Sequence, residues 1–118
     1  KYHKIEIIEL KDDSNYQKET SNLLEHIKSS DYNIALDIKG KMVTSEEFAS
    51  IIDKTFLTNS TITFIIGGSL GLNEEIKSKC QAIISFSHLT FPHGLFRGIL
   101  LEQIYRSFKI LNNEAYHK

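Results

Sequence analysis

The sequence contains one cysteine, one proline and no tryptophan among its 118 residues. A single cysteine, Cys80, cannot form an internal disulfide, which excludes a disulfide-stabilised secreted domain and is typical of a reducing compartment. The chain also lacks a signal-peptide pattern at its start and any apolar run of the roughly 18 residues that span a bilayer. We therefore expect a single cytoplasmic domain over residues 1–118, with no membrane partner.

A strong charge of one sign is absent as well. The formal net charge is -1, which argues against a strongly basic nucleic-acid binder. The distribution is uneven, because residues 88–118 hold four basic and two acidic side chains, so 4 - 2 = +2. This basic carboxyl-terminal part is compatible with contacts to a few phosphates. It is equally compatible with cations placed near the carboxyl ends of helices.

Apolar residues follow strand and helix periodicities in alternation. Thr44 and Glu47 have the spacing of a capping box, and Phe48 and Ile52 lie on one face of the helix that would follow. Strands are expected at 4–10, 32–38, 61–66 and 82–87, a turn at 39–41, and helices at 16–29, 44–56, 73–80 and 92–112. This order predicts a three-layer α/β domain with a mostly parallel sheet.

Two of the expected strands lead into loops suited to ligand binding. The strand 61–66 runs into a glycine-rich segment at 67–71, and the strand 82–87 runs into the segment 88–93. We expect these strands to be neighbours, with a ligand crevice beyond their carboxyl ends. The glycine-rich segment lacks dinucleotide-binding or P-loop spacing, so spacing alone favours a structural turn.

The last expected helix is apolar on several sides, and one sheet cannot cover its whole circumference. Such a helix is either enclosed within its domain or part of a subunit interface, and we expect a homodimer. Its apolar residues are Leu95, Phe96, Ile99, Leu100, Leu101, Ile104, Tyr105, Phe108, Ile110 and Leu111.

Metal and nucleophile patterns are missing. The five histidines show no metal-ligand spacing, so we expect no metal. Cys80, near the end of an expected helix, fits a small core residue better than a nucleophile.

Four separated motifs carry a resemblance to a known family. They are Leu36–Lys41, Ile65–Gly71, Phe86–His93 together with Arg97, and Glu114–Lys118. In this order they resemble the bacterial RlmH family of the SPOUT superfamily, from about Ile5 to Lys118. Members of that family begin with a further strand and helix that this sequence lacks. They also have a longer loop after Leu10 and a branched apolar residue where Gly98 stands here.

The resemblance implies an α/β fold whose carboxyl-terminal part forms a trefoil knot. It also implies a homodimeric enzyme that uses S-adenosylmethionine bound in the knot. Its implied reaction is methylation of N3 of a pseudouridine in 23S ribosomal RNA, on the assembled ribosome or large subunit. The rival interpretations are a SPOUT methyltransferase with another target, such as transfer RNA, and a catalytically dead module that binds RNA or protein.

The resemblance also assigns the cofactor contacts. Leu36 and Leu89 can offer apolar faces to an adenine ring, and Gly67 lets the backbone approach a ligand without a Cβ. Unpaired amides and carbonyls in the loop after the fourth strand can read the adenine edge. The full set is Leu36, Gly67, Phe86, Ser87, His88, Leu89, Thr90 and Phe91.

Catalysis at N3 is easier once the weakly acidic imide proton has been removed, and histidine is the side chain best matched to that proton. His117 and His93 are the candidate bases, and Tyr116 could orient the ring. We expect the tail Tyr116–Lys118 to lie over the cofactor, with the partner subunit as a possible source.

Cationic side chains complete the set. Arg97 would bind a phosphate or the cofactor carboxylate, or else form a structural ion pair with Glu102 or another acid. Lys118, Arg106 and Lys41 are the candidate RNA contacts, although Arg106 would also fit as a solvated helix charge and Lys41 as a turn residue.

Overall fold

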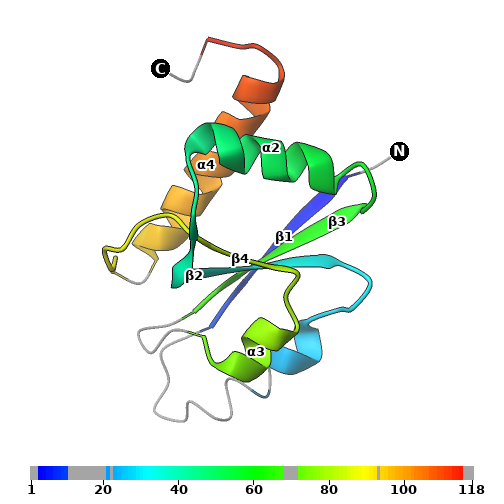
Figure 1. Ribbon diagram of the computed structural model, residues 1–118, viewed down its shortest axis with the longest axis vertical. Coiled ribbons are helices and arrows are strands. Elements are labelled where there is room, and N and C mark those ends of the chain that lie inside the picture. The colour runs from blue at the N-terminus through cyan, green and yellow to red at the C-terminus, as the bar shows by residue number, and fades with distance from the viewer. Residues whose placement is uncertain (1–2, 11–20, 22, 68–71, 93, 116–118) are drawn as a thin grey trace.

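The protein, described here from a computed structural model, is an α/β domain built on one parallel sheet (Figure 1). The structure describes residues 3–10, 21, 23–67, 72–92 and 94–115. The strands are β1 (Lys4–Glu9), β2 (Tyr32–Met42), β3 (Thr61–Ile66) and β4 (Ala82–Ser85), and the helices are α2 (Ser45–Thr55), α3 (Glu74–Ser78) and α4 (Leu95–Leu111). None of the described helices has the length and apolar character required to cross a membrane.

The strand order is β1-β3-β2-β4, with every pairing parallel. The expectation that β3 and β4 are neighbours is therefore wrong, because β2 lies between them. Leu36 of β2 is in register with Ile66 of β3 on one side and with Ile84 of β4 on the other. The carboxyl ends of β3 and β4 thus meet at the same edge, separated by one strand.

Helices cover both faces of the sheet, which gives the three layers that the sequence predicts (Figure 1). Side chains alternate between two cores, because successive residues of a strand point to opposite faces. Ile34 and Phe64 pack toward α2 and α4, whereas Ala35 and Ile65 pack toward α3. Strands buried on both faces need continuous apolar runs, and this explains their sequences.

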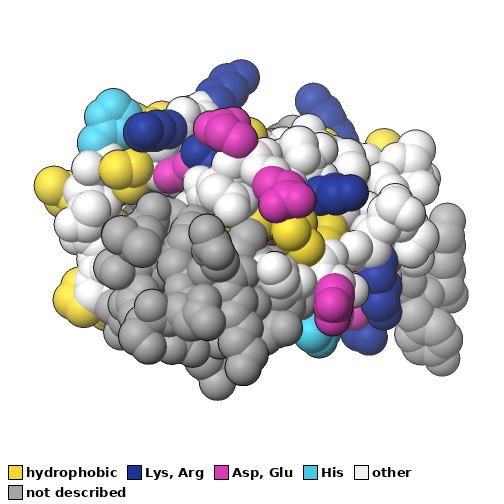
Figure 2. All heavy atoms as spheres, turned by 90° about the horizontal axis from the view of Figure 1, so that it is seen from below, with side chains coloured by type: hydrophobic (Ala, Val, Ile, Leu, Met, Phe, Trp, Pro, Cys, Tyr) yellow, Lys and Arg dark blue, Asp and Glu magenta, His cyan; other side chains and the backbone are white. Residues whose placement is uncertain are grey.

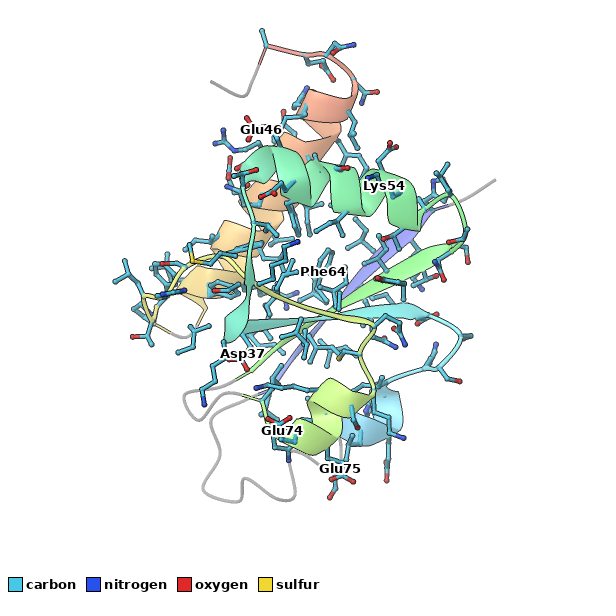
Figure 3. All side chains as sticks on the ribbon, in the orientation of Figure 1. Asp37, Glu46, Lys54, Phe64, Glu74 and Glu75 are labelled. Carbon is cyan, nitrogen blue, oxygen red and sulfur yellow. The ribbon has the colours of Figure 1, made fainter. Side chains whose placement is uncertain are left out.

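Helix α2 begins as its sequence predicts. The Thr44 side chain accepts a hydrogen bond from the Glu47 amide at 3.1 Å, and the Glu47 carboxylate accepts one from the Thr44 amide at 2.8 Å. Phe48 and Ile52 are fully buried against the sheet, and Phe64 lies between the sheet and α2 (Figure 3). The capping box and the apolar face are confirmed.

The turn expected at 39–41 is wrong, because β2 continues to Met42 through an irregularity. Leu36 and Lys41 are both in register with Ile84, so the residues between them form a bulge. Within the bulge, Gly40 lies directly against β4: a Cβ added there would stand 2.8 Å from backbone atoms of Ile83 and Ile84. The close approach of two backbones therefore requires glycine.

Two helix boundaries also differ from expectation. Helix α4 begins at Leu95, after Gly94 with φ of 87°, and Pro92 lies outside it with its carbonyl accepting from the Leu95 amide at 3.2 Å. The described part of the first expected helix ends at His26 rather than Ser29. Positive φ is easy for glycine and unfavourable for other residues, so Gly94 sets the start of α4.

Cys80 packs beside the core on the α3 side of the sheet. Its thiol lies 3.5 Å from the Ile76 carbonyl oxygen. Burial raises the pKa of the Cys80 thiol from 9.0 to about 11. A thiol with so little thiolate is a poor nucleophile, which supports the interpretation of Cys80 as a core residue.

Substituting Gly40→Ala should lower the free energy of unfolding by about 1–3 kcal/mol, because the added methyl group overlaps the β4 backbone. Urea unfolding followed by circular dichroism measures this. Gly98→Ala is the matched control. A Cβ at Gly98 meets nothing within 4 Å, so helix propensity alone should raise stability by about 0.5–1 kcal/mol. Equal effects at the two positions would contradict the close approach.

Cys80 should react slowly with a disulfide reagent in the native protein. At pH 8 a pKa of about 11 lowers the thiolate fraction about 100-fold relative to a pKa of 9.0, and labelling should accelerate up to about pH 11. Because the unfolded thiol ionises first, stability should also fall as the pH rises from about 9 to about 11. Stopped-flow labelling of native and urea-unfolded protein measures the difference; equal rates would contradict it.

Candidate functional site

The candidate site lies at the carboxyl edge of the sheet. One register row crosses the sheet there, from Glu9 through Ile66 and Leu36 to Ile84. Gly67 follows directly after this row on β3, and Phe86 follows two residues after it beyond β4. The structure therefore brings the predicted cofactor residues Leu36, Gly67 and Phe86 to one edge.

Leu36 does not present a free apolar face. Its side chain is 5% exposed and packs in the core formed with α2 and α4, together with Ile66 and Ile84. The predicted contact between this side chain and an adenine ring stays a prediction, and the backbone of Leu36 is a further group that a ligand at this edge could contact.

A chain of aromatic rings fixes both ends of the loop after β4. The Phe86 ring meets Phe48 of α2 edge-on, with centroids 5.1 Å apart, and meets Phe96 of α4 at 5.6 Å. Phe91 stacks on the same Phe96 ring at 6.0 Å. Phe48 in turn packs on Phe64 of β3 at 5.6 Å. The loop is thereby tied to the centre of the domain.

The middle of this loop has its own hydrogen bonds and faces solvent. The Ser85 hydroxyl donates to the Ser87 carbonyl at 3.0 Å, and the Leu89 amide donates to the Ser87 hydroxyl at 3.0 Å. His88, Leu89 and Thr90 are exposed, and Leu89 is 69% exposed. A loop with anchored ends and an exposed middle can offer backbone groups and one apolar side chain to a flat ligand.

A nearly buried ion pair at this edge was not predicted from the sequence. Lys77 of α3 pairs with Asp37, the residue after Leu36, and their side chains are 11% and 10% exposed. Asp37 lies in the middle of β2, and Figure 3 shows it on the α3 side of that strand. A helix of five residues is too short to be stable alone, so the pair helps hold α3 at this edge.

The signal for this pair was present in the sequence. Asp37 is a charged residue directly after a buried apolar run, and Lys77 follows Ile76, the buried residue of a short helix. Charged residues are seldom so buried without a partner. Each of the two charged side chains was therefore expected to have a partner, but the spacing of residues in the sequence could not identify that partner.

Arg97 lies in the first turn of α4 and contacts Glu9, the β1 residue of the register row. Its Nη1 is 3.7 Å from Oε1 of Glu9, so a structural partner exists, but this partner is not Glu102. The Arg97 side chain is still 45% exposed. A guanidinium in a long, half-exposed ion pair retains donors for a phosphate or carboxylate. The binding of such an anion by Arg97 therefore stays a prediction.

The other candidate cations differ in their surroundings. Arg106 is bound by Glu102 within α4, with Nη2 2.7 Å and Nε 3.1 Å from Oε2. The network continues through Gln103 to Ser45 on α2. These contacts give Arg106 a structural role within α4, and its contact with RNA stays a prediction. Lys41 is exposed near the end of β2, and its contact with RNA stays a prediction.

Four predicted residues lie outside the described residues: His93, Tyr116, His117 and Lys118. Among the residues that the structure does describe, no group of three or more His, Cys, Asp or Glu side chains could hold a metal ion. On the α3 side of the molecule, cationic and anionic side chains alternate among the described atoms (Figure 2). That face therefore carries no large patch of one charge among those atoms.

Comparisons with known proteins identify the family of this chain. The family model described as "Predicted SPOUT methyltransferase" matches residues 1–117. Ribosomal RNA large subunit methyltransferase H from Clostridium botulinum (strain Okra / Type B1) is 50% identical over 131 aligned residues, which cover 100% of this chain and 82% of the relative. Ribosomal RNA large subunit methyltransferase H 1 from Clostridium perfringens (strain SM101 / Type A) is 44% identical with the same coverage.

A family match over nearly the whole chain, together with relatives of this identity, establishes the family. As its four motifs predicted, the chain belongs to the SPOUT methyltransferase family and, within it, to the RlmH group of large-subunit ribosomal RNA methyltransferases.

Proposed function

We propose that the protein transfers a methyl group from S-adenosylmethionine to N3 of a pseudouridine in 23S ribosomal RNA, as a homodimer acting on the large subunit or ribosome. The observation that carries this proposal is that the anchored loop between Phe86 and Phe91 and the residue Gly67 both follow strands at the same carboxyl edge, with β2 between those strands. The names of the relatives support the choice of ribosomal RNA over transfer RNA. Such a substrate implies work in the cytoplasm.

The cofactor edge fits the donor through backbone groups. The exposed middle of the loop, from Ser87 to Thr90, offers amides and carbonyls for an adenine edge, and Leu89 offers an apolar face. Gly67 permits close approach on the opposite side of Leu36. When bound, S-adenosylmethionine supplies an electrophilic methyl group on a cationic sulfur. The proposed trefoil knot would enclose this edge, as the family implies.

The chain's own groups then handle the proton and the anion. In the proposal His117, or His93, accepts the N3 proton of the base, and Tyr116 orients that imidazole. Arg97 holds a phosphate or a carboxylate at the edge, with Glu9 as its partner when the anion is absent. Lys41 and Lys118 contact RNA phosphates, which adds a few cations to a nearly neutral surface.

The geometry of α4 supports a tail donated by the partner subunit. Helix α4 starts beside the site and, with 17 residues, extends about 25 Å away from it. His117 is two residues beyond Ala115, and a chain covers at most about 3.6 Å per residue. In Figure 1 the residues after α4 up to 115 continue beyond the far end of that helix, which favours a tail donated by the partner subunit over one that folds back along the same helix.

A second apolar stripe on α4 supports the dimer. Leu101, Tyr105 and Phe108 follow each other at helical spacing and are 48%, 52% and 41% exposed. Leu100 and Ile104, on the adjoining face of the helix, are buried in the core. One face of α4 is thus used within the subunit. We propose that the exposed stripe packs on a second copy of the chain.

Removing residues 116–118 should leave cofactor affinity within about twofold and abolish methyl transfer, because the tail meets the base rather than the donor. Calorimetry measures the affinity. Transfer of labelled methyl groups to unmodified large subunits measures turnover, with bulk transfer RNA as the negative control. Unchanged turnover would overturn the tail's role, and preferential labelling of transfer RNA would overturn the proposed substrate.

An experiment that mixes two inactive variants of the chain tests which subunit donates the tail. The truncated chain and a Gly67→Val chain are each expected to be inactive, since one lacks the tail and the other blocks the donor. Co-refolded at equal amounts, they should regain about one quarter of the wild-type activity, because half the dimers are mixed and each has one complete site. Absence of any recovery would contradict donation between subunits.

Leu101→Arg should convert the dimer to a folded monomer without methyl transfer, since a buried, unpaired charge is strongly unfavourable in an apolar interface. Multi-angle light scattering measures the mass, and circular dichroism checks the fold. Leu57→Arg is the control, because Leu57 is 73% exposed and lies after α2, away from the stripe. A dimeric Leu101→Arg protein would refute this interface.

A further inference from the structure

The carboxyl end of α4 is held in one defined conformation. After the last helical residue, Leu111, the backbone of Asn113 has φ of 54°. The Asn113 amide donates to the Ile110 carbonyl at 3.1 Å, and the Glu114 amide donates to the Lys109 carbonyl at 2.8 Å. These two bonds form a Schellman motif, with asparagine in the left-handed position that glycine usually occupies.

A side-chain contact reinforces this turn. The Lys109 ammonium is 2.9 Å from Oε1 of Glu114 and 5.2 Å from the centre of the Tyr105 ring. The hydrogen bond from Lys109 to Glu114 raises the pKa of that ammonium. Glu114 is therefore joined to α4 through its backbone and its side chain.

This arrangement links the tail to the exposed stripe. Tyr105 belongs to the stripe proposed as the subunit interface, and Lys109 contacts both Tyr105 and Glu114. The tail Tyr116–Lys118 begins two residues after Glu114. Helix ends on a protein surface commonly fray. At this end, two backbone hydrogen bonds and one ion pair restrict the direction in which the chain leaves α4.

We propose that Asn113 and the Lys109–Glu114 pair are positioning residues that set the direction in which the tail leaves α4 toward the partner's site. This inference rests on the proposed function, in which the tail meets the base. The three tail residues span at most about 11 Å. A change in the dihedral angles of Asn113 therefore moves His117 by a large part of its reach.

Asn113→Ala is the decisive variant, because alanine disfavours the left-handed conformation whereas glycine adopts it readily. With saturating cofactor, well below the unfolding temperature, Asn113→Ala should lower kcat about 10- to 100-fold, the scale expected for a misplaced catalytic group. Cofactor affinity and dimer mass should not change. Asn113→Gly should restore kcat to within about threefold of wild type, since only the backbone conformation matters.

Asn112→Ala is the matched control. Asn112 caps the same helix end, with its side-chain amide donating to the Phe108 carbonyl at 2.9 Å, but its φ of -98° suits any residue. It should lower stability without lowering kcat. If Asn113→Ala keeps wild-type kcat, or if Asn112→Ala and Asn113→Gly lose as much kcat as Asn113→Ala, the positioning role is overturned.

Lys109→Met gives a second measurement that does not alter the turn residues. It removes the ion pair with Glu114 and keeps an apolar chain beside Tyr105. It should lower kcat about three- to tenfold at unchanged cofactor affinity, because the turn remains but is less restricted; unchanged kcat would count against the proposal. Failure of the proposed function is distinguishable, since the protein without residues 116–118 would then remain active.

Discussion

The pairing of β2 with β3 on one side and β4 on the other is the constraint on which the candidate site depends. Leu36 lies between Ile66 and Ile84 in one register row, and all three side chains are buried in the same core. A slip of one residue would turn each of these side chains toward the other face. The burial of this row therefore fixes where Gly67 and Phe86 emerge at the carboxyl edge.

Groups on both faces of the sheet then secure that edge. On the face of α2 and α4, the aromatic contacts of Phe86 and Phe91 with Phe96 hold the two ends of the loop that follows β4. On the face of α3, the pair formed by Asp37 and Lys77 joins the middle of β2 to a helix too short to be stable alone. The exposed backbone that we propose to bind the cofactor thus has partly buried supports on both faces of the sheet.

Helix α4 connects this edge to the rest of the proposed enzyme. Its start carries Phe96 and Arg97 at the candidate site, and its far end carries the turn at Asn113 and Glu114 that we propose sets the direction of the tail. Its buried side packs on the core, and its exposed side carries Leu101, Tyr105 and Phe108. The candidate site at the start of α4 and the tail after its far end are separated by about 25 Å of helix within one subunit. Association of two copies can bring them together again.

The sequence by itself determined the local features, because these depend on neighbouring residues. The alternating strands and helices, the capping box of Thr44 and Glu47, and the motifs of the RlmH group were all readable before the structure. Only the tertiary structure decided which strands are neighbours, that Gly40 lies against β4, and that Arg97 faces Glu9. Those features join residues far apart in the chain, so they follow from how the buried faces pack together and not from periodicity or spacing.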